Sequence, residues 1–429
     1  TSSLGPSSVR TSRDEGVDQA NVALGRRTAQ GHPQPVSPLR QRGVVADGRQ
    51  DVLSPAFEIH VHHQDGRHVP YCCADAGIVI SASHNPHHDN GVKFFGPHGA
   101  KLSDAVEAQI EQLLESPLQT VAPEAIGLAR RIDDAQGRYI EYCKASFGDG
   151  RLDGVRMVLD CANGAAYRTA PAVFDELGAE IVELIGGHPD GFNINVDCGS
   201  THLDRLSAAV RRHQADLGIA FDGDADRCLM VDGQGEVVDG DQILYALALQ
   251  RQRKGVLRGP VVGTLMSNLG LEQALQRAGI AFVRAAVGDR YVMEQLAAHD
   301  GMIGGETSGH TLCLDKSVTG DGCITALQVL AAMQEHGCTL AALVSGMTRC
   351  PQVLINVRVS GAAEALLQRD EVRAAERSAE QQLGARGRVL LRASGTEPLV
   401  RVMVEADDAG LAQQQAQGIA DAVARAAAG

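Results

Sequence analysis

The spacing of apolar and polar positions changes at about residue 74. Residues 1–73 show no sustained strand or helix period, which is typical of a loop or a disordered segment, and they offer only a weak strand candidate at 57–61. From residue 74 onward, short apolar runs alternate with longer amphipathic segments. This alternation predicts an α/β fold in which helices cover parallel strands.

A similar order of elements occurs twice in this α/β part of the chain. The first copy runs from a strand at 157–159 through a helix ending near Leu177 to a strand at 180–184. The second runs from a strand at 261–265 through a helix to a strand at 281–284. We interpret this weak internal repeat as two similar βαβ domains in tandem, with right-handed crossovers.

The C-terminal part of the chain has a different pattern. A helix at about 321–335 closes the second βαβ unit, and strands and helices then follow in a mixed order. The expected elements are strands at 353–359, 389–391 and 400–404 and helices at 370–382 and from about residue 410. This order predicts a small α+β domain appended to the α/β body.

Composition excludes several classes of protein. The chain of 429 residues is 44% apolar and 21% charged, which is ordinary for a globular protein, and at about 150 residues per domain it suggests about three domains. It contains no apolar run near the ~18 residues of a membrane span and no recognisable secretory signal. The cysteines form no Cys-x-x-Cys pair, so we expect reduced thiols and a cytoplasmic location.

The net charge bears on possible partners. A formal charge of −14 argues against a nucleic-acid partner. An anionic ligand such as a phosphate would therefore need a local cluster of basic side chains and backbone N–H groups.

The first candidate site is the segment Ser-Ala-Ser-His-Asn-Pro at 81–86, which follows an expected buried strand at 77–80. Binding loops of α/β sheets lie at such strand ends, so Ser83 is a candidate nucleophile and Lys93 a charge-balancing group. For an isolated serine, the simpler interpretation is a hydroxyl that caps the next turn. A hydrolase of the Gly-x-Ser-x-Gly type is not indicated.

The second candidate site is stronger. Asp222, Asp224 and Asp226 alternate with small residues, so extended backbone would place all three carboxylates on one face. Carboxylate oxygens suit Mg²⁺, and an EF-hand is excluded because Arg227 and Gly233 stand where that loop needs Gly and Glu. The alternative is a solvated acidic turn, in which the crowded carboxylates would repel one another.

The third candidate site is Gly-Glu-Thr-Ser-Gly-His at 305–310. Glu306 and Ser308 alternate and are suited to hydrogen-bonding sugar hydroxyls, and His310 could move a proton near neutral pH. Taken alone, a glycine-flanked glutamate is more often an ordinary turn residue.

The fourth candidate site lies near the C-terminus. Arg392 and Arg401 offer forked donors to phosphate oxygens, Ser394 and Thr396 add hydroxyls, and Gly395 would let backbone N–H groups approach. An ordinary hairpin turn is an equally good interpretation of this segment by itself.

Together, from about residue 74 to the C-terminus, these segments resemble the α-D-phosphohexomutase family. The motifs that carry the resemblance are Ser-His-Asn-Pro, Asp-Gly-Asp-x-Asp-Arg, Gly-Glu-x-Ser-Gly-His and Ser-Gly-Thr-Glu-Pro. The stretches 263–268, 287–291, 314–316 and 319–322 further resemble members that act on glucosamine phosphates.

The resemblance implies four domains around a central cleft, each contributing one motif. It implies a mutase that interconverts glucosamine 6-phosphate and glucosamine 1-phosphate through glucosamine 1,6-bisphosphate, feeding UDP-N-acetylglucosamine synthesis. The domains expected after an aberrant or disordered segment 1–73 are 74–150, 151–252, 253–346 and 347–429.

The resemblance also implies a role for each candidate residue. Ser83 would carry the transferred phosphate. That phosphate and the carboxylates of Asp222, Asp224 and Asp226 would together hold Mg²⁺. The remaining assignments are Lys93 and Arg227 beside the phosphoryl group, Glu306 and Ser308 on the sugar, His310 for proton transfer, and Arg392, Ser394, Gly395, Thr396 and Arg401 on the non-reacting phosphate.

The chain departs from the family pattern in places. The usual Gly-Thr-Asp-Gly-Ile-Arg-Gly and Asp-Thr-Arg segments are missing from residues 1–73, and we interpret this region as a replaced or wrong-frame half-domain. Ala225 stands where Gly is usual, Ala393 where Lys is common, and Thr307 where Gln or Asn is common in glucosamine enzymes. Three alternatives stay open: a glucose or mannose phosphate mutase, an inactive sugar-phosphate-binding remnant, and a metal-dependent phosphatase.

Overall fold

The computed structural model describes residues 43–44, 60–62, 68–70, 76–96, 99, 101–127, 129–359, 363–394 and 397–428. The chain divides into two compact units, residues 1–45 with 102–132, and residues 46–101 with 133–429. Residues 1–73, which we interpret as a replaced or wrong-frame half-domain, lie almost wholly outside the described residues. Among those described, no helix has the length and apolar character that a membrane crossing requires.

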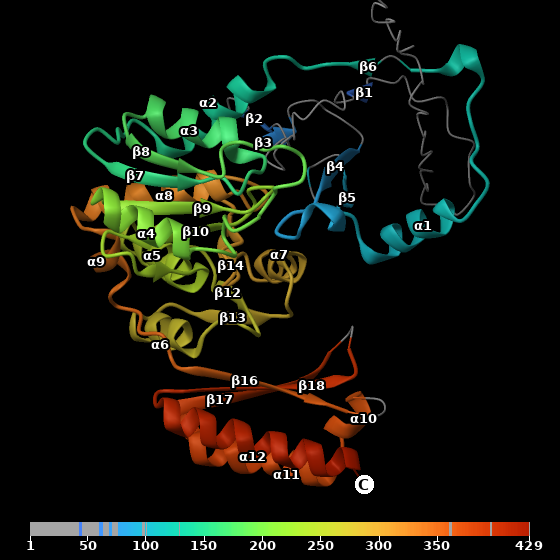
Figure 1. Ribbon diagram of the computed structural model, residues 1–429, viewed down its shortest axis with the longest axis vertical. Coiled ribbons are helices and arrows are strands. Elements are labelled where there is room, and N and C mark those ends of the chain that lie inside the picture. The colour runs from blue at the N-terminus through green and yellow to red at the C-terminus, as the bar shows by residue number, and fades with distance from the viewer. Residues whose placement is uncertain are drawn as a thin grey trace, which may run out of the picture. The chain divides into compact units, whose positions relative to one another are not determined.

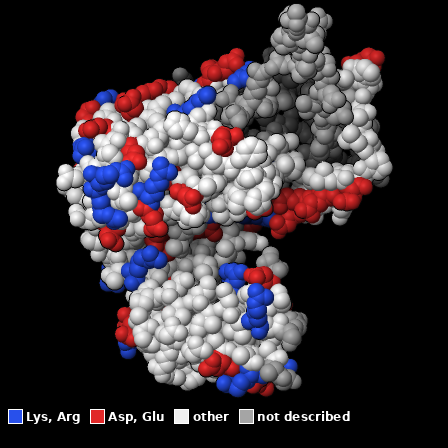
Figure 2. Space-filling model, viewed as in Figure 1, with Lys and Arg blue, Asp and Glu red and all other residues white. Residues whose placement is uncertain are grey.

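The first unit is small in its described part. Strand β1 (Gly43–Val44) pairs in parallel with β6 (Ala129–Arg130), and helix α1 (Asp104–Leu114) and the 3₁₀ turn η3 (Pro123–Ala125) complete it. Helix α1 buries Ile110. Its acidic residues Asp104, Glu107 and Glu111 are exposed, and Figure 2 shows acidic side chains gathered over this helix.

The second unit begins with two antiparallel pairs of strands. Strand β2 (His60–His62) pairs with β3 (His68–Pro70), so the strand candidate at 57–61 overlaps β2 only at residues 60 and 61, and residues 57–59 lie outside the described part. Strand β4 (Gly77–Ser81) pairs with β5 (Gly91–Phe95), and the 3₁₀ turn η2 (His87–Asp89) lies between them.

The expectation that strand 77–80 is buried is wrong. The strand is present as β4, but Ile78 and Ile80 are 60% and 63% exposed. Among the described strands only β5 pairs with β4, so a two-stranded ribbon cannot cover these side chains on both faces.

The first βαβ repeat lies in a five-stranded sheet of order β11-β10-β9-β7-β8. Its strands are β7 (Arg156–Asp160), β8 (Glu180–Ile185), β9 (Leu217–Phe221), β10 (Cys228–Asp232) and β11 (Val237–Val238). Strand β7 is parallel to β8 and β9, whereas β10 runs antiparallel to β9 and β11. The predicted parallel pairing of the first repeat is confirmed.

The second repeat lies in a four-stranded sheet of order β13-β12-β14-β15. Its strands are β12 (Val261–Thr264), β13 (Phe282–Ala285), β14 (Ile303–Gly305) and β15 (Thr311–Cys313). Strand β12 is parallel to β13 and β14, and β15 returns antiparallel to β14. The two sheets therefore share more than the βαβ unit, because each continues into an antiparallel pair.

Helices fill the space beside and between these two sheets (Figure 1). They are α2 (Ala135–Phe147), α3 (Ala166–Glu176), α4 (Asp204–His213), α5 (Gly240–Arg253), α6 (Leu269–Arg277), α7 (Asp289–Ala298), α8 (Gly322–His336) and α9 (Leu340–Val344). Helix α4 packs on one face of the first sheet and α7 on one face of the second, while α5 and α8 contact both sheets. One apolar core consequently runs through both repeats, from Tyr139 to Met347.

The C-terminal domain is a three-stranded antiparallel sheet of order β16-β18-β17. Its elements are β16 (Gln352–Arg358), α10 (Ala363–Leu367), α11 (Asp370–Leu383), η4 (Gly384–Arg386), β17 (Gly387–Ala393), β18 (Leu399–Ala406) and α12 (Ala409–Ala428). Helices α11 and α12 pack together, and their apolar residues share a separate core with the sheet. The predicted α+β domain is confirmed.

Candidate active site

Each of the four sequence motifs lies in a turn that joins two antiparallel strands. The turns join β4 to β5, β9 to β10, β14 to β15 and β17 to β18. Strands β9 and β14 occupy matching places in the two sheets, so the metal candidate and the sugar candidate are equivalent turns of the repeat. An antiparallel turn holds its tip close to two strand ends, which gives each motif a fixed base.

The Ser83 turn is held against the turn that follows β9. The Ser83 hydroxyl oxygen lies 3.4 Å from Oδ2 of Asp222, and the Ser83 carbonyl accepts the backbone N–H of Gly223 at 3.1 Å. The side-chain amide of Asn195 donates to the same carbonyl at 2.8 Å. A Cβ on Gly223 would lie 2.3 Å from the Ser83 carbonyl oxygen, so only glycine permits this approach.

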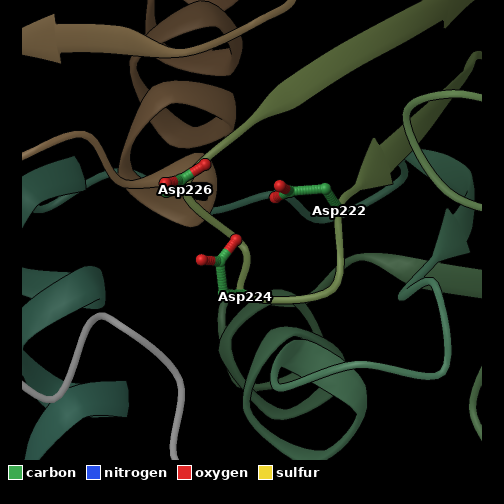
Figure 3. A group of neighbouring side chains, drawn as sticks. All are labelled: Asp222, Asp224 and Asp226. Carbon is green, nitrogen blue, oxygen red and sulfur yellow. The ribbon is translucent and has the colours of Figure 1, made fainter. Parts of the chain in front are cut away.

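Asp222, Asp224 and Asp226 form one group of carboxylates. Asp222 and Asp224 are fully buried, and the three side chains offer oxygens within 4.8 Å of one another. Figure 3 shows the three carboxyl groups directed toward a common space. Oδ1 of Asp224 and Oδ1 of Asp226 are buried and accept no hydrogen bond. The only side-chain donor that an ion pair places near these two oxygens, among the described residues, is Nδ1 of His310, 3.4 Å from Oδ1 of Asp226, and such poorly paired anionic oxygens fit a site that a divalent cation would complete.

Two basic side chains face this acidic group. Nζ of Lys93 lies 2.5 Å from Asp224 and 3.5 Å from Asp226, and Nε of Arg227 lies 4.0 Å from Asp222. Burial and the two neighbouring aspartates raise the pKa of Asp222 well above its usual range. Burial lowers the pKa of Lys93, but Asp224 and Asp226 outweigh this effect and leave the pKa raised. The mutual repulsion of the carboxylates is thus only partly balanced by side chains.

His310 lies between two acidic residues and is only 5% exposed. Its Nδ1 lies 3.4 Å from Asp226 and its Nε2 lies 3.6 Å from Asp289. Burial lowers the pKa of His310, but these carboxylates outweigh it and the pKa is raised. An isolated β-bridge between Arg227 and His310 joins the β9–β10 turn to the β14–β15 turn, which we call the metal turn and the sugar turn after the roles predicted for them. The structure therefore brings the first three motifs together.

The sugar turn is hydrogen-bonded to Asp241 of α5 and to Gly288, the residue before α7. The N–H of Gly288 donates to Oε1 of Glu306 at 3.0 Å. The hydroxyl of Thr307 donates to the buried Asp241 at 2.8 Å, so Thr307 faces the protein interior. Ser308 is half-buried. Of the three residues in the middle of the motif, Glu306 and Ser308 are the ones left to face a ligand.

The fourth motif is only partly described. Arg392 and Arg401 are paired across β17 and β18, and Nε of Arg401 is buried without a hydrogen-bond partner. Ser394 ends the turn on the β17 side, where its N–H donates to the carbonyl of Leu399. Gly395 and Thr396 lie outside the described residues. Within the described residues, no hydrogen bond or ion pair connects this motif to the other three.

Sequence reasoning missed several residues that hold the site. Asn195, Asp241, Asp289 and Lys101 all contact a motif residue or its neighbour. Of these four residues, only Asp289 could have been predicted from the sequence, because it lies in the stretch 287–291 that resembles glucosamine enzymes. The others are single polar residues, and only the folded chain brings them to the motifs.

Comparison with known proteins supports the pattern of motifs. Family models described as "Phosphoglucomutase/phosphomannomutase" match residues 43–120 (domain I), 137–235 (domain II), 239–350 (domain III) and 354–422 (C-terminal domain). A relative from Shewanella sp. called phosphoglucosamine mutase 2 is 58% identical over 357 residues, covering 82% of this chain and 79% of its own. A phosphoglucosamine mutase from Alkalilimnicola ehrlichii is 57% identical over 351 residues, covering 82% and 77%.

Solved structures show the same fold. A phosphoglucomutase/phosphomannomutase family protein from Burkholderia thailandensis has a TM-score of 0.69 at 22% identity, covering 86% of this chain and 80% of its own. An N-acetylphosphoglucosamine mutase from Aspergillus fumigatus, in complex with GlcNAc-6P and magnesium, has a TM-score of 0.65 at 21% identity, covering 82% and 89%.

Proposed function

Because the chain belongs to the phosphoglucomutase/phosphomannomutase family, we propose that it interconverts glucosamine 6-phosphate and glucosamine 1-phosphate. The observation that carries this proposal is the position of the Ser83 hydroxyl, 3.4 Å from the first carboxylate of the acidic group. A serine in that position can accept and return a phosphoryl group. The phosphoglucosamine mutases among its relatives, at 57–58% identity, favour the amino sugar as substrate.

The acidic group fits a resident magnesium ion, held by Asp222, Asp224 and Asp226 together with the phosphate on Ser83. The ion would neutralise charge on the transferring phosphoryl group. Without it, a phosphoserine near −2 and three aspartates would face only Lys93 and Arg227, which leaves about −3 against an incoming phosphate. This balance follows from the residues themselves and explains why the activity should need the ion.

We assign a separate role in phosphoryl transfer to each of Ser83, His310, Lys93 and Arg227. The phosphoryl group leaves the Ser83 oxygen for the free hydroxyl of the sugar monophosphate, so that hydroxyl loses a proton and the Ser83 oxygen gains one, and we assign this proton transfer to His310. The bisphosphate reverses its orientation in the site, and its other phosphoryl group returns to Ser83. Lys93 and Arg227 balance charge on the transferring group.

The remaining assignments concern binding. Glu306 and Ser308 hydrogen-bond sugar hydroxyls, and the phosphate that does not react is held by Arg392, Ser394, Gly395, Thr396 and Arg401. Glucosamine 1,6-bisphosphate serves as activator and intermediate. Holding the substrate in the right orientation supplies much of the rate in such a reaction.

The test is a mutase assay on the purified chain. With Mg²⁺ and a trace of glucosamine 1,6-bisphosphate, we expect glucosamine 1-phosphate to be converted to glucosamine 6-phosphate, and EDTA to abolish the conversion until Mg²⁺ is restored. Ser83→Ala should lower kcat by at least about a thousandfold, because no other hydroxyl replaces the nucleophile. Ser345→Ala, at an exposed serine of the loop after α9, should leave kcat unchanged.

Three outcomes would contradict the proposal. Inorganic phosphate release that survives Ser83→Ala would indicate a phosphatase that uses the Asp222 group. Faster turnover of glucose or mannose 1-phosphate would indicate a different hexose. Binding without any turnover in the wild type would indicate an inactive remnant.

A further inference from the structure

We propose that Asp289 selects the amino sugar by pairing its carboxylate with the ammonium group that distinguishes glucosamine phosphates from glucose phosphates. This inference rests on the proposed function, since it concerns the substrate of the same site. Three features support it: the position of Asp289, the cation that already contacts its carboxylate, and the orientation of Thr307.

Asp289 lies where the sugar turn and the metal turn meet. It is the first residue of α7, directly after Gly288, whose N–H donates to Oε1 of Glu306 at 3.0 Å. On its other side, Oδ2 of Asp289 lies 3.6 Å from Nε2 of His310. A ligand that contacts both Glu306 and His310 therefore comes within reach of the Asp289 carboxylate.

An ammonium group already contacts this carboxylate. Nζ of Lys101 forms an ion pair with Oδ2 of Asp289, and the two side chains are 36% and 23% exposed. The side chain of Lys101 ends in the same chemical group that an amino sugar carries at neutral pH. Because the pair is accessible to solvent, a substrate ammonium can replace Lys101 at little cost.

The charge state of Asp289 suits this role. Burial raises the pKa of Asp289, but His310 and Lys101 outweigh that effect and the pKa is lowered. The carboxylate is thus ionised at neutral pH and can accept a charge-assisted hydrogen bond.

The orientation of Thr307 removes one polar side chain of the sugar turn from those that could contact the amino group. Thr307 stands between the two hydroxyl-binding candidates, yet its hydroxyl donates to Asp241 in the interior at 2.8 Å. Oε1 of Glu306 is already occupied by the N–H of Gly288. Asp289 is the nearby carboxylate whose partner is a half-exposed, exchangeable cation.

A purely structural role for Asp289 makes a different prediction. If Asp289 served only to orient His310, its loss would impair proton transfer for every hexose phosphate alike. If it reads the ammonium group, its loss would impair glucosamine phosphates selectively. The ratio of the two substrates separates these roles, because an effect on His310 cancels in the ratio.

The experiment measures kcat/KM for glucosamine 1-phosphate and glucose 1-phosphate in Asp289→Asn. We expect the preference for glucosamine to fall by about 10- to 100-fold, mainly through KM for the amino sugar, which is the usual size of one charge-assisted hydrogen bond. Asp289→Glu should keep most of the preference. Glu294→Gln removes a paired carboxylate one turn further along α7 and should leave the ratio unchanged.

A binding measurement covers the case in which a variant loses activity for other reasons. In a Ser83→Ala background, titration calorimetry with glucosamine 6-phosphate and glucose 6-phosphate should show the same loss of preference in Asp289→Asn. Equal losses for both sugars, or no change for either, would overturn the inference. A wild-type chain that does not convert glucosamine 1-phosphate would instead reject the proposed function itself.

Discussion

Ala225 lies in the middle of the metal turn with a φ of 60°, in the left-handed region that glycine favours. Its N–H donates to the carbonyl of Asp222, and its own carbonyl accepts the N–H of Gly322 at the start of α8. The turn can present alternate aspartates only with this conformation at its centre. The strain explains why glycine is usual at this position in the family that the sequence resembled.

Replacing Ala225 by glycine should stabilise the protein. The left-handed conformation costs a residue with a Cβ roughly 1–2 kcal/mol, and part of this gain is lost to the greater freedom of glycine in the unfolded chain. We expect Ala225→Gly to raise the free energy of unfolding by up to about 1 kcal/mol, measured by urea titration. A loss of stability would show that the turn does not hold this conformation.

Asp241 gives stability a pH dependence that is independent of the metal turn. Burial first, and then Asp239, raise the pKa of Asp241 to about 6 from its usual 3.8. Between these two values the folded chain binds a proton more tightly than the unfolded chain does, so this group's contribution to stability falls as pH rises from about 4 to about 6.

The variant Asp241→Asn removes this titration and can still accept the hydroxyl of Thr307. We expect the difference in unfolding free energy between variant and wild type to shift in the variant's favour by about 2 kcal/mol from pH 4 to pH 7. Urea titrations at each pH measure this difference. A difference that stays constant across the range would mean that Asp241 has the same pKa in the folded and unfolded chains.

Among single residues, the sequence indicated site residues where several polar side chains stand close together in one segment. The alternation of Asp222, Asp224 and Asp226 correctly indicated that the carboxylates converge, but the expected cause was wrong, because a turn with Ala225 at φ 60° brings them together and not extended backbone. Asn195 and Lys101 could not be found in this way, since each is an isolated polar residue brought to the site by a loop.

The turns between antiparallel strands are the elements that build the site. The β9–β10 turn carries the aspartates, the equivalent β14–β15 turn carries Glu306 and His310, and the β4–β5 turn carries Ser83. The βαβ repeat was visible in the sequence, although weakly, because the order of strand, helix and strand occurs twice. The returning strands β10 and β15 were not predicted, although β10 has five residues like β7, because no helix separates either of them from the strand before it.

The loop before α8 supports His310 by close packing. A Cβ on Gly320 would lie 2.3 Å from Nε2 of His310, and the ring is too buried to move aside freely. We expect Gly320→Ala to displace His310 from Asp226 and to destabilise the protein by about 1–3 kcal/mol. The mutase assay should show a loss of kcat of about tenfold or more, which is a small part of what a proton-transferring group contributes.

A matched control is available in α12. Gly418 has no neighbour within 4 Å of the position of an added Cβ, so Gly418→Ala should preserve kcat and slightly raise stability. Unchanged activity in Gly320→Ala would show that the ring of His310 has more freedom than its packing indicates.

At the scale of the whole chain, the third and C-terminal domains are joined by buried polar contacts. Glu405 is fully buried and accepts the N–H of Leu269 at 2.9 Å and Nε of Arg388 at 2.5 Å. The side-chain amide of Asn268 donates to the same carboxylate at 3.3 Å. No sequence pattern indicated this junction, because its members are spread from residue 268 to 405 and only Asn268 lies in one of the stretches that carried the resemblance.

The whole chain carries a charge of −14, yet the proposed substrate is an anion. The positive charges that would offset this repulsion are local: Lys93, Arg227, the C-terminal arginines Arg392 and Arg401, and a bound divalent ion. The central claim is that such an ion, held by three alternate aspartates, lets Ser83 give up and recover a phosphoryl group.

The most direct test follows phosphate on the peptide that contains Ser83 by mass spectrometry. The chain is first phosphorylated with glucosamine 1,6-bisphosphate, freed of small molecules, and then mixed with glucosamine 6-phosphate in Mg²⁺ or in EDTA. We expect phosphate to leave Ser83 and to appear as the sugar bisphosphate in Mg²⁺, and to stay on Ser83 in EDTA. Phosphate on another residue, or equal transfer under both conditions, would contradict this expectation.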